Sequence, residues 1–324
     1  MNAVLVLIAA ATAAEPAPKI VNGEEEAGFP SVYSLGAEFG ANRLSLCTGN
    51  LITPRIILTA AHCSEGVPIE LLVTAGKAFG GPVVNDATEI LTFSDASIHP
   101  GYVPLANGPG GTLGENDIAV IILAEPATTR PVLLRQAAVT DEDLGKELLS
   151  VGFGITETGG GDGVKRSAPL LLDDYDDFFL LTENESNENN ANICSGDSGG
   201  PQFSWVEDHW EQWAVHSWGD QNCRQISGST RVDIVYEWIF DQVEAIHGTR
   251  DQCEANGWYG DGACDPWCPI EDVDCLPAEE PEEEVVDGEG DPKGSGGCSA
   301  VRPPLSLGWA LLPLALLRRG RRRP

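Results

Sequence analysis

The sequence predicts an all-β domain over residues 20 to about 247, closed by one C-terminal helix. Short apolar runs are bounded by Gly, Pro, Asn and Asp, a pattern typical of short strands joined by turns. Three of these runs are 51–58, 118–123 and 213–217. Helical periodicity is convincing only at 232–246, where four apolar residues share one face: Ile234, Trp238, Val243 and Ile246. Many short strands with one terminal helix indicate paired β-barrels or a β-sandwich.

Length and charge narrow the class of protein further. The chain has 324 residues, enough for one large or two modest domains with extensions. Its formal net charge is −31, and a surface this acidic repels phosphate backbones. We therefore expect no nucleic-acid partner, and the acidic excess suits solubility outside the cell or cation binding.

Cysteine usage points to an oxidising compartment. The chain has nine cysteines and one methionine, and eight of the cysteines fall into even-numbered groups. These groups are Cys47 and Cys63, Cys194 and Cys223, and the late cluster Cys253, Cys264, Cys268 and Cys275. Pairs with one leftover, Cys298, indicate disulfides. Zinc binding is the weaker alternative, because no Cys-x-x-Cys pair occurs and histidine is not interleaved with the late cluster.

The N-terminus has the pattern of a secretory signal peptide. Residues 3–14 are apolar and end in small residues that suit cleavage, although no Lys or Arg precedes them. Twelve apolar residues are too few to span a membrane. We expect residues 1–14 to be the signal peptide.

Three short segments carry residues suited to nucleophilic catalysis. His62 follows an apolar run, Asp117 precedes one, and Ser198 lies in the Gly-Asp-Ser-Gly-Gly-Pro segment 196–201. Acyl-enzyme chemistry needs a hydroxyl nucleophile, a base and a carboxylate that orients the base, the roles expected of Ser198, His62 and Asp117. Glycines around Ser198 allow a tight turn in which the N–H groups of Gly196 and Ser198 point into one oxyanion hole. A lone His or Asp in such positions is usually structural, so the three segments carry weight only together.

In the order His, Asp, Ser, these segments closely resemble the chymotrypsin/trypsin-like serine endopeptidases over residues 20–247. The resemblance implies two packed six-stranded Greek-key β-barrels with a C-terminal helix. It also implies protein or peptide substrates and catalysis without a required cofactor. The alternative is a catalytically silent protease-like domain that serves for surface binding or adhesion, and the intact triad and segment 196–201 argue against it.

The resemblance extends to activation and to two disulfides. Ile-Val-Asn-Gly after Lys19 resembles the activation site of this family, which makes 15–19 a short propeptide. Cleavage after Lys19 by an activating protease would free the Ile20 amine to pair with Asp197. The implied disulfides are Cys47–Cys63 and Cys194–Cys223. His99 matches a structural stretch of this family and is assigned no catalysis, and three further histidines are expected to be surface or packing residues: His209, His216 and His247.

The resemblance also assigns the substrate-binding residues. In the family, the residue six positions before the nucleophile forms the floor of the primary pocket, and here it is Asn192. Because Asn192 is neutral, a strong preference for basic residues is not expected. The strand Ser217-Trp218-Gly219 is expected to pair with the substrate backbone, with Gly219 leaving the pocket entrance open.

Residues 248–275 form a short Cys-rich acidic unit that follows the barrels. A unit this small lacks room for a hydrophobic core, so its four cysteines must cross-link it, and three pairings are open. Four carboxylates between the cysteines are candidate calcium ligands or else solvated turns: Asp261, Asp265, Asp272 and Asp274. A second alternative function makes this unit the working part, as an adhesion or calcium module.

The C-terminal residues predict surface anchoring. Residues 276–297 are acidic, with Pro and Gly, and predict a disordered linker. Residues 298–324 join Cys298, a short apolar segment and an Arg cluster, which resembles the C-terminal surface-sorting tags of the myxobacterial type. The resemblance implies sorting machinery and a membrane as partners, with Cys298 as the point of processing or lipidation. We expect the protein to be secreted and anchored at the outer cell surface.

Overall fold

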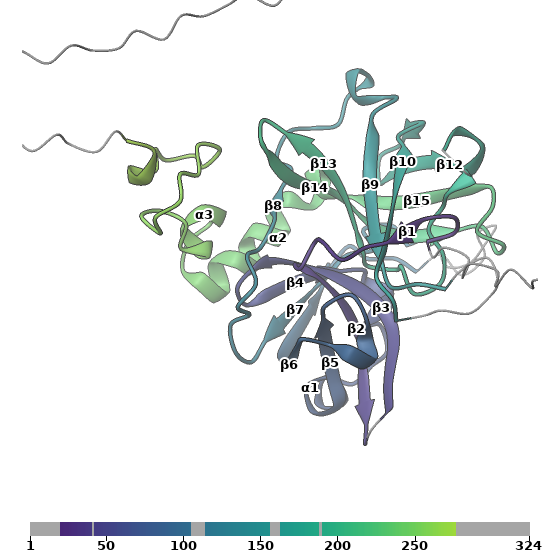
Figure 1. Ribbon diagram of the computed structural model, residues 1–324, viewed down its shortest axis with the longest axis horizontal. Helices are drawn as coiled ribbons and strands as arrows, with labels where there is room; N and C mark the ends of the chain where they lie inside the picture. The colour runs from purple at the N-terminus through teal and green to yellow at the C-terminus, as the bar shows by residue number, and fades with distance from the viewer. Residues whose placement is uncertain (1–19, 41, 105–113, 156–162, 188–189, 277–324) are drawn as a thin grey trace, which may run out of the picture. The chain divides into compact units, whose positions relative to one another are not determined.

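A computed structural model describes residues 20–40, 42–104, 114–155, 163–187 and 190–276 (Figure 1). The predicted signal peptide, the propeptide with Lys19, the acidic linker after Leu276 and the sorting tag with Cys298 lie outside the described residues. All described residues belong to one compact unit. Within these ranges, no helix combines the length and the apolar character that a membrane crossing needs.

The N-terminal half forms a closed six-stranded barrel (Figure 1). Its strands are β2 (Val32–Phe39), β3 (Asn42–Thr53), β4 (Ile56–Thr59), β5 (Gly76–Gly80), β6 (Glu89–Ile98) and β7 (Ala119–Leu123). They pair in the order β2-β3-β4-β7-β6-β5, and β5 closes onto β2. Strands β4 and β7 are buried throughout, as the apolar residues that fill β7 and all of β4 except Thr59 predict. The helix α1 (Ile69–Ala75) lies in the loop after β4 and was not predicted.

The C-terminal half, joined by β1 from the N-terminus, forms a nine-stranded sheet, where the prediction was a six-stranded barrel. Its strands are β1 (Glu24–Glu25), β8 (Leu133–Leu134), β9 (Glu147–Gly152), β10 (Arg166–Leu171), β11 (Asp174–Tyr175), β12 (Phe179–Glu183), β13 (Pro201–Val206), β14 (His209–Gly219) and β15 (Ile226–Arg231). Six longer strands run in the order β10-β9-β13-β14-β15-β12. Strands β1, β11 and β8 add to this run, and each is two residues long, too short to show the alternation that predicts a strand.

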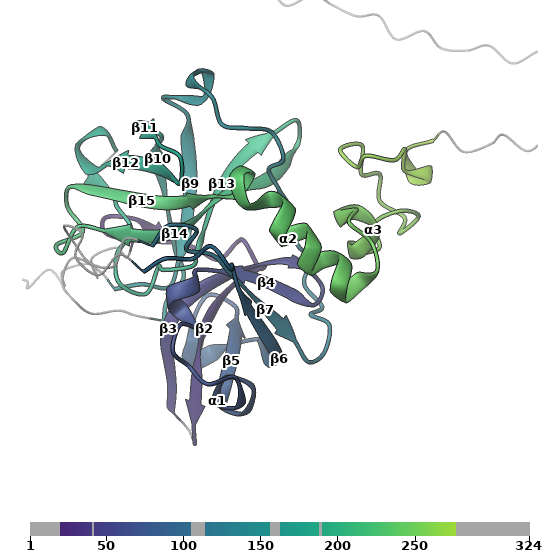
Figure 2. The ribbon, with the colours of Figure 1, turned by 180° about the vertical axis from the view of Figure 1, so that it is seen from behind.

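The predicted C-terminal helix is α2 (Val232–His247), which ends at Gly248 in the left-handed conformation, with φ 77°. It packs on a core that includes residues of both halves (Figure 2). The buried side chains of the helix are Val232, Val235, Ile239, Phe240 and Val243. The prediction that Ile234 shares the buried face is wrong: Ile234 is 40% exposed, because the buried stripe passes through Val235 and Ile239 instead.

Residues 248–276 pack against the rest of this unit. The structure pairs Cys253 with Cys268 and Cys264 with Cys275, a choice that the sequence left open. Gln252 begins the helix α3 (Gln252–Asn256) and is buried, with its amide donating to the carbonyls of Ile52 and Val132. Short 3₁₀ helices complete the described elements: η1 (Ala61–Cys63), η2 (Val84–Asp86), η3 (Asp141–Asp143), η4 (Asn184–Ser186) and η6 (Val273–Cys275).

Candidate active site

Strand pairing in the barrel brings His62 and Asp117 together. His62 lies in η1, just after β4, Asp117 lies just before β7, and the two strands are paired with Thr59 opposite Ala119. The Nδ1 atom of His62 lies 2.7 Å from Oδ2 of Asp117, and the backbone N–H of His62 donates to Oδ1 at 2.9 Å. Because a carboxylate accepts, Nδ1 carries the proton, and Nε2 is left as a base.

Two hydroxyls from the nine-stranded sheet also hold Asp117, which is fully buried. Ser217 on β14 donates to Oδ2 of Asp117 at 2.6 Å, and Thr230 on β15 donates to its backbone carbonyl at 3.2 Å. The carboxylate is therefore fixed from both halves of the molecule. Sequence reasoning assigned Ser217 to substrate binding and missed both contacts, because residues 100 or more positions apart give no local signal.

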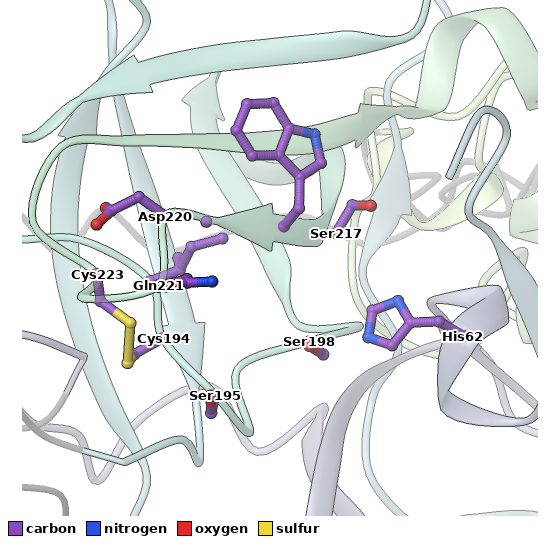
Figure 3. Close-up of a pocket in the computed structure, with 11 residues that line it drawn as sticks. His62, Cys194, Ser195, Ser198, Ser217, Asp220, Gln221 and Cys223 are labelled. Atoms are coloured by element: carbon purple, nitrogen blue, oxygen red, sulfur yellow. A yellow bond between two sulfur atoms is a disulfide. The ribbon is translucent and has the colours of Figure 1, made fainter. Parts of the chain in front are cut away.

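Ser198 and His62 line the same cavity of about 350 Å³ (Figure 3). Three predicted substrate-binding residues, Ser217, Trp218 and Gly219, line it as well. Further lining residues that sequence reasoning did not name are Ile193, Ser195, Asp220 and Gln221. The one signal for them is that they lie inside or next to the loop bounded by Cys194 and Cys223.

The turn that carries Ser198 needs glycine. Gly196 has φ 95°, and a Cβ there would lie 2.8 Å from the Cα of Gly154. Its backbone carbonyl accepts from the Thr48 hydroxyl at 2.9 Å. In the described part of the chain, the N–H groups of Gly196 and Ser198 donate to no protein acceptor. Ser198 lines the cavity and Gly196 lies two positions before it, and two unengaged N–H groups in such a turn are the donors that a developing oxyanion requires.

The Asp197 carboxylate is buried behind this turn. It accepts from the N–H groups of Gly154 at 2.8 Å and Cys194 at 2.9 Å. A side chain at Gly152 or Gly154 would collide with it. Full burial without a cationic partner among the described residues raises the pKa of Asp197 from 3.8 to about 7. This carboxylate is thus placed to gain from a nearby positive charge.

The start of the described chain lies close to the same region. Ile20 is fully buried in a cluster with Ala191 and Ile193, and Val21 pairs with Asn192 in an isolated β-bridge. The pairing of Ile20 with Asp197 stays a prediction, and Lys19 lies outside the described residues.

Asn192 lies beside the cavity, but it is not one of the lining residues. It is fully buried, and its side-chain oxygen accepts from the N–H of Ile193 at 2.8 Å. Its amide nitrogen has no partner within the described ranges. The bridge to Val21 holds the backbone of Asn192, so that Ile193, one position later, contributes to the cavity wall.

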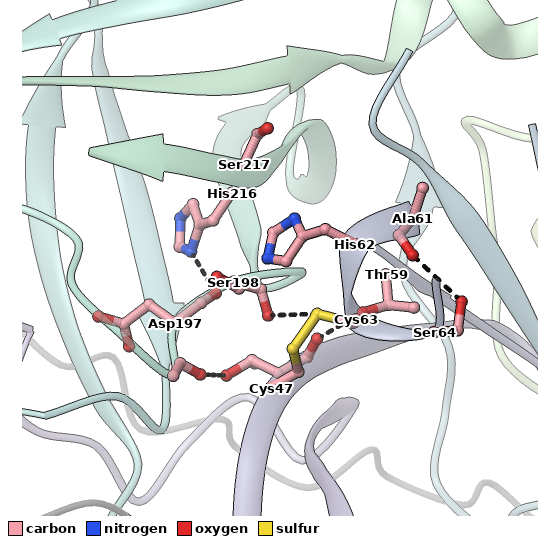
Figure 4. Close-up of a disulfide and its surroundings, with 12 residues drawn as sticks. Cys47, Thr59, Ala61, His62, Cys63, Ser64, Asp197, Ser198, His216 and Ser217 are labelled. Atoms are coloured by element: carbon pink, nitrogen blue, oxygen red, sulfur yellow. Dashed lines mark hydrogen bonds between the residues drawn. A yellow bond between two sulfur atoms is a disulfide. The ribbon is translucent and has the colours of Figure 1, made fainter. Parts of the chain in front are cut away.

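Disulfides bracket the two loops that carry His62 and Ser198. Cys47 is bonded to Cys63, next to His62, with a Cα–Cα distance of 6.2 Å (Figure 4). Cys194 is bonded to Cys223 with a Cα–Cα distance of 5.4 Å and closes one end of the cavity (Figure 3). Both bonds restrict loops whose side chains must keep a fixed separation.

The described residues offer one group of donor atoms with metal-like spacing: Cys47, His62 and Cys63. Both sulfurs belong to a disulfide, so this group is unsuited to a metal.

The four candidate calcium ligands are engaged by protein groups. Asp265 forms an ion pair with Arg130, as does Asp261 at 3.4 Å. Asp272 accepts from the N–H groups of Gly260 and Asp265, and Asp274 accepts from that of Gly262. Calcium binding at these residues stays a prediction.

Comparisons with known proteins agree with this geometry. The family model described as Trypsin matches residues 20–239. Ovochymase from Halocynthia roretzi is 28% identical over 254 residues, which cover 73% of this chain and 15% of the relative. Vitamin K-dependent protein C from Mus musculus is 28% identical over 256 residues, 71% of this chain and 53% of the relative, and its Rattus norvegicus counterpart is 27% identical. The chain spans about half of the protein C sequences and less of ovochymase.

Proposed function

The chain belongs to the trypsin family of serine proteases, and on that premise we propose that it hydrolyses peptide bonds in proteins through an acyl-enzyme on Ser198. The observation that carries the proposal is the 2.7 Å hydrogen bond between His62 and Asp117 at a cavity that Ser198 also lines. A base oriented by a buried carboxylate, beside a serine hydroxyl, is the arrangement that acyl transfer requires.

Each proposed role follows from the chemistry of the group. The Nε2 atom of His62 removes the proton from the Ser198 hydroxyl as its oxygen attacks the scissile carbonyl. The imidazolium that forms is stabilised by the Asp117 carboxylate. His62 then protonates the leaving amine, and water repeats the sequence on the acyl-enzyme. The N–H groups of Gly196 and Ser198 stabilise the oxyanion of both tetrahedral intermediates.

We also propose that the enzyme is made as a zymogen and is activated by cleavage after Lys19. The buried Asp197 carboxylate, without a cationic partner among the described residues, supports this step. The freed Ile20 amine would supply the missing positive charge, and the pair would hold the turn that carries Gly196 and Ser198. Ile20 is already buried, which is consistent with this role.

We propose that the primary pocket prefers substrate residues other than Arg and Lys. Asn192 supplies no negative charge beside the cavity, so a basic side chain would lack the charge-assisted contact that contributes ~1.5–3 kcal/mol. The Asp220 carboxylate lines the cavity, but it accepts from the N–H groups of Asn222, Arg224 and Gln225. These three contacts hold the carboxylate as a loop cap.

The four disulfides fit an extracellular protein. We propose in addition that the mature enzyme is anchored at the outer cell surface through its sorting tag, with Cys298 as the point of processing or lipidation. Calcium binding by residues 248–275 is a further proposal, for which isothermal calorimetry with Ca²⁺ is the direct test.

The decisive experiment is the intact mass of the full chain, clipped after Lys19, after treatment with a peptidyl phosphonate that carries a neutral recognition group. The Ser198→Ala variant is the matched control. One adduct on the wild type alone supports an activated Ser198. No adduct on folded, clipped protein with several recognition groups would contradict the proposal and favour a silent binding domain.

A further inference from the structure

His216 lies in β14, one residue before Ser217, and its imidazole is completely buried behind the turn that carries Ser198 (Figure 4). Its Nδ1 atom lies 3.1 Å from the backbone carbonyl oxygen of Asp197. Because a carbonyl only accepts, Nδ1 carries the proton and donates it. A Cβ at Gly200 would lie 2.9 Å from Nδ1, so the ring packs directly on this turn.

This hydrogen bond fixes the direction of one oxyanion donor. The peptide unit that joins Asp197 to Ser198 is planar and trans, so its carbonyl and its N–H point in opposite directions. Because the His216 side chain holds the Asp197 carbonyl pointing toward itself, the Ser198 N–H points in the opposite direction, away from His216. That N–H has no protein acceptor in the described part of the chain.

We infer that His216 is a positioning residue that holds the Ser198 N–H in place for the oxyanion. The inference rests on the proposed function. His216 is not one of the residues that line the cavity, and it acts through the peptide unit between Asp197 and Ser198.

The two oxyanion donors are held in different ways. The carbonyl of Ser195, which belongs to the same peptide unit as the Gly196 N–H, accepts from the backbone N–H of Ile155 at 2.7 Å. The carbonyl of Asp197 accepts from the backbone N–H of Gly200 at 2.8 Å and, in addition, from the His216 side chain. A substitution at His216 therefore loosens the Ser198 donor and leaves the Gly196 donor as it is.

The backbone hydrogen bonds of His216 do not depend on its side chain, so a substitution there leaves them in place. The N–H of His216 donates to the carbonyl of Gly200 at 2.7 Å, and its own carbonyl accepts from Gly199 at 2.8 Å. These bonds survive any change of side chain. The other ring nitrogen, Nε2, has no partner within the described residues, so the Asp197 carbonyl is the single polar contact that a substitution removes.

The test compares His216→Asn with His216→Leu in the activated full chain. Asparagine can place an amide N–H where Nδ1 stands, whereas leucine fills similar space without a donor. We measure kcat and KM on a peptide substrate and the affinity for a peptidyl boronate, which mimics the tetrahedral state. We expect leucine to lower kcat and boronate affinity together by about 10- to 100-fold, below the ~10²–10³-fold of a lost donor because the Gly200 N–H remains. KM should stay within about twofold.

The asparagine variant should recover most of the lost kcat. Equal loss in both variants, an unchanged kcat in leucine, or a loss confined to KM would overturn the inference. His216→Val, which is smaller and also lacks a donor, replaces leucine if the latter fails to fold, as judged by its thermal unfolding. A wild type that gives no phosphonate adduct refutes the proposed function itself, which is a different outcome from an active wild type that tolerates leucine.

Discussion

Raising the pH should destabilise the uncleaved protein through one buried carboxyl, that of Asp197. Burial raises its folded-state pKa from 3.8 to about 7. In the unfolded chain the same carboxyl titrates near 3.8, so between these values the unfolded state has released a proton that the folded state still holds. The resulting stability is fully present below pH 4 and is lost as the pH rises to 7.

The size of the effect follows from the two pKa values. Each tenfold difference in proton affinity is worth about 1.4 kcal/mol, so the difference between 3.8 and about 7 corresponds to ~4 kcal/mol. In our proposal, cleavage after Lys19 reverses the sign of this dependence of stability on pH. The Ile20 amine would lower the pKa of Asp197, and its ionised form would then stabilise the folded state above pH 4.

Urea unfolding measures this directly. The Lys19→Gln chain, which cannot be clipped at that position, is compared with the Lys19→Gln, Asp197→Asn double variant between pH 4 and pH 8. The difference in unfolding free energy between the two should fall by ~4 kcal/mol across this range, because other carboxyls contribute equally to both. Parallel curves for the two chains would refute the reasoning. A difference that grows with pH would mean that Asp197 already has a cationic partner before cleavage.

Three further predictions concern the site and the docked C-terminal residues. Ser198→Ala should lower kcat by ~10⁶-fold in a peptidase assay, and substantial residual turnover would contradict the acyl-enzyme mechanism. Ser217→Ala removes a 2.6 Å hydrogen bond to the Asp117 carboxylate. In the same assay, kcat should therefore fall by a factor equivalent to ~1.5–3 kcal/mol with little change in KM. An unchanged kcat would show that the hydroxyl is dispensable. Arg130→Ala leaves the buried carboxylate of Asp265 without its partner, and thermal unfolding should show a loss of ~1–3 kcal/mol; an unaltered unfolding temperature would mean that the ion pair contributes nothing.

The sequence predicted what depends on neighbours in the chain. The apolar run at 118–123 became β7, and the glycines around Ser198 allow the turn that their positions indicated. The helix at 232–246 was predicted, but its buried face was assigned one position away from Val235. Because apolar residues lie on more than one side of this helix, tertiary packing decides which face is buried.

Contacts between distant segments could not be predicted from the sequence. The hydrogen bond from Ser217 to Asp117 joins residues 100 positions apart. The β-bridge between Val21 and Asn192 joins residues 171 positions apart and fixes the backbone of Asn192 beside the cavity. His216 shows no local pattern that distinguishes a buried donor from a surface residue.

The packing of residues 248–276 has a mechanical consequence. Gln252 is hydrogen-bonded to Ile52 in the barrel, to Val132 in the segment that leads out of the barrel, and to Leu134 in β8 of the nine-stranded sheet. A force that pulls on the chain beyond Leu276 would meet two disulfide loops and then these buried hydrogen bonds before it reached α2. The load would therefore be shared between the barrel and the start of the nine-stranded sheet.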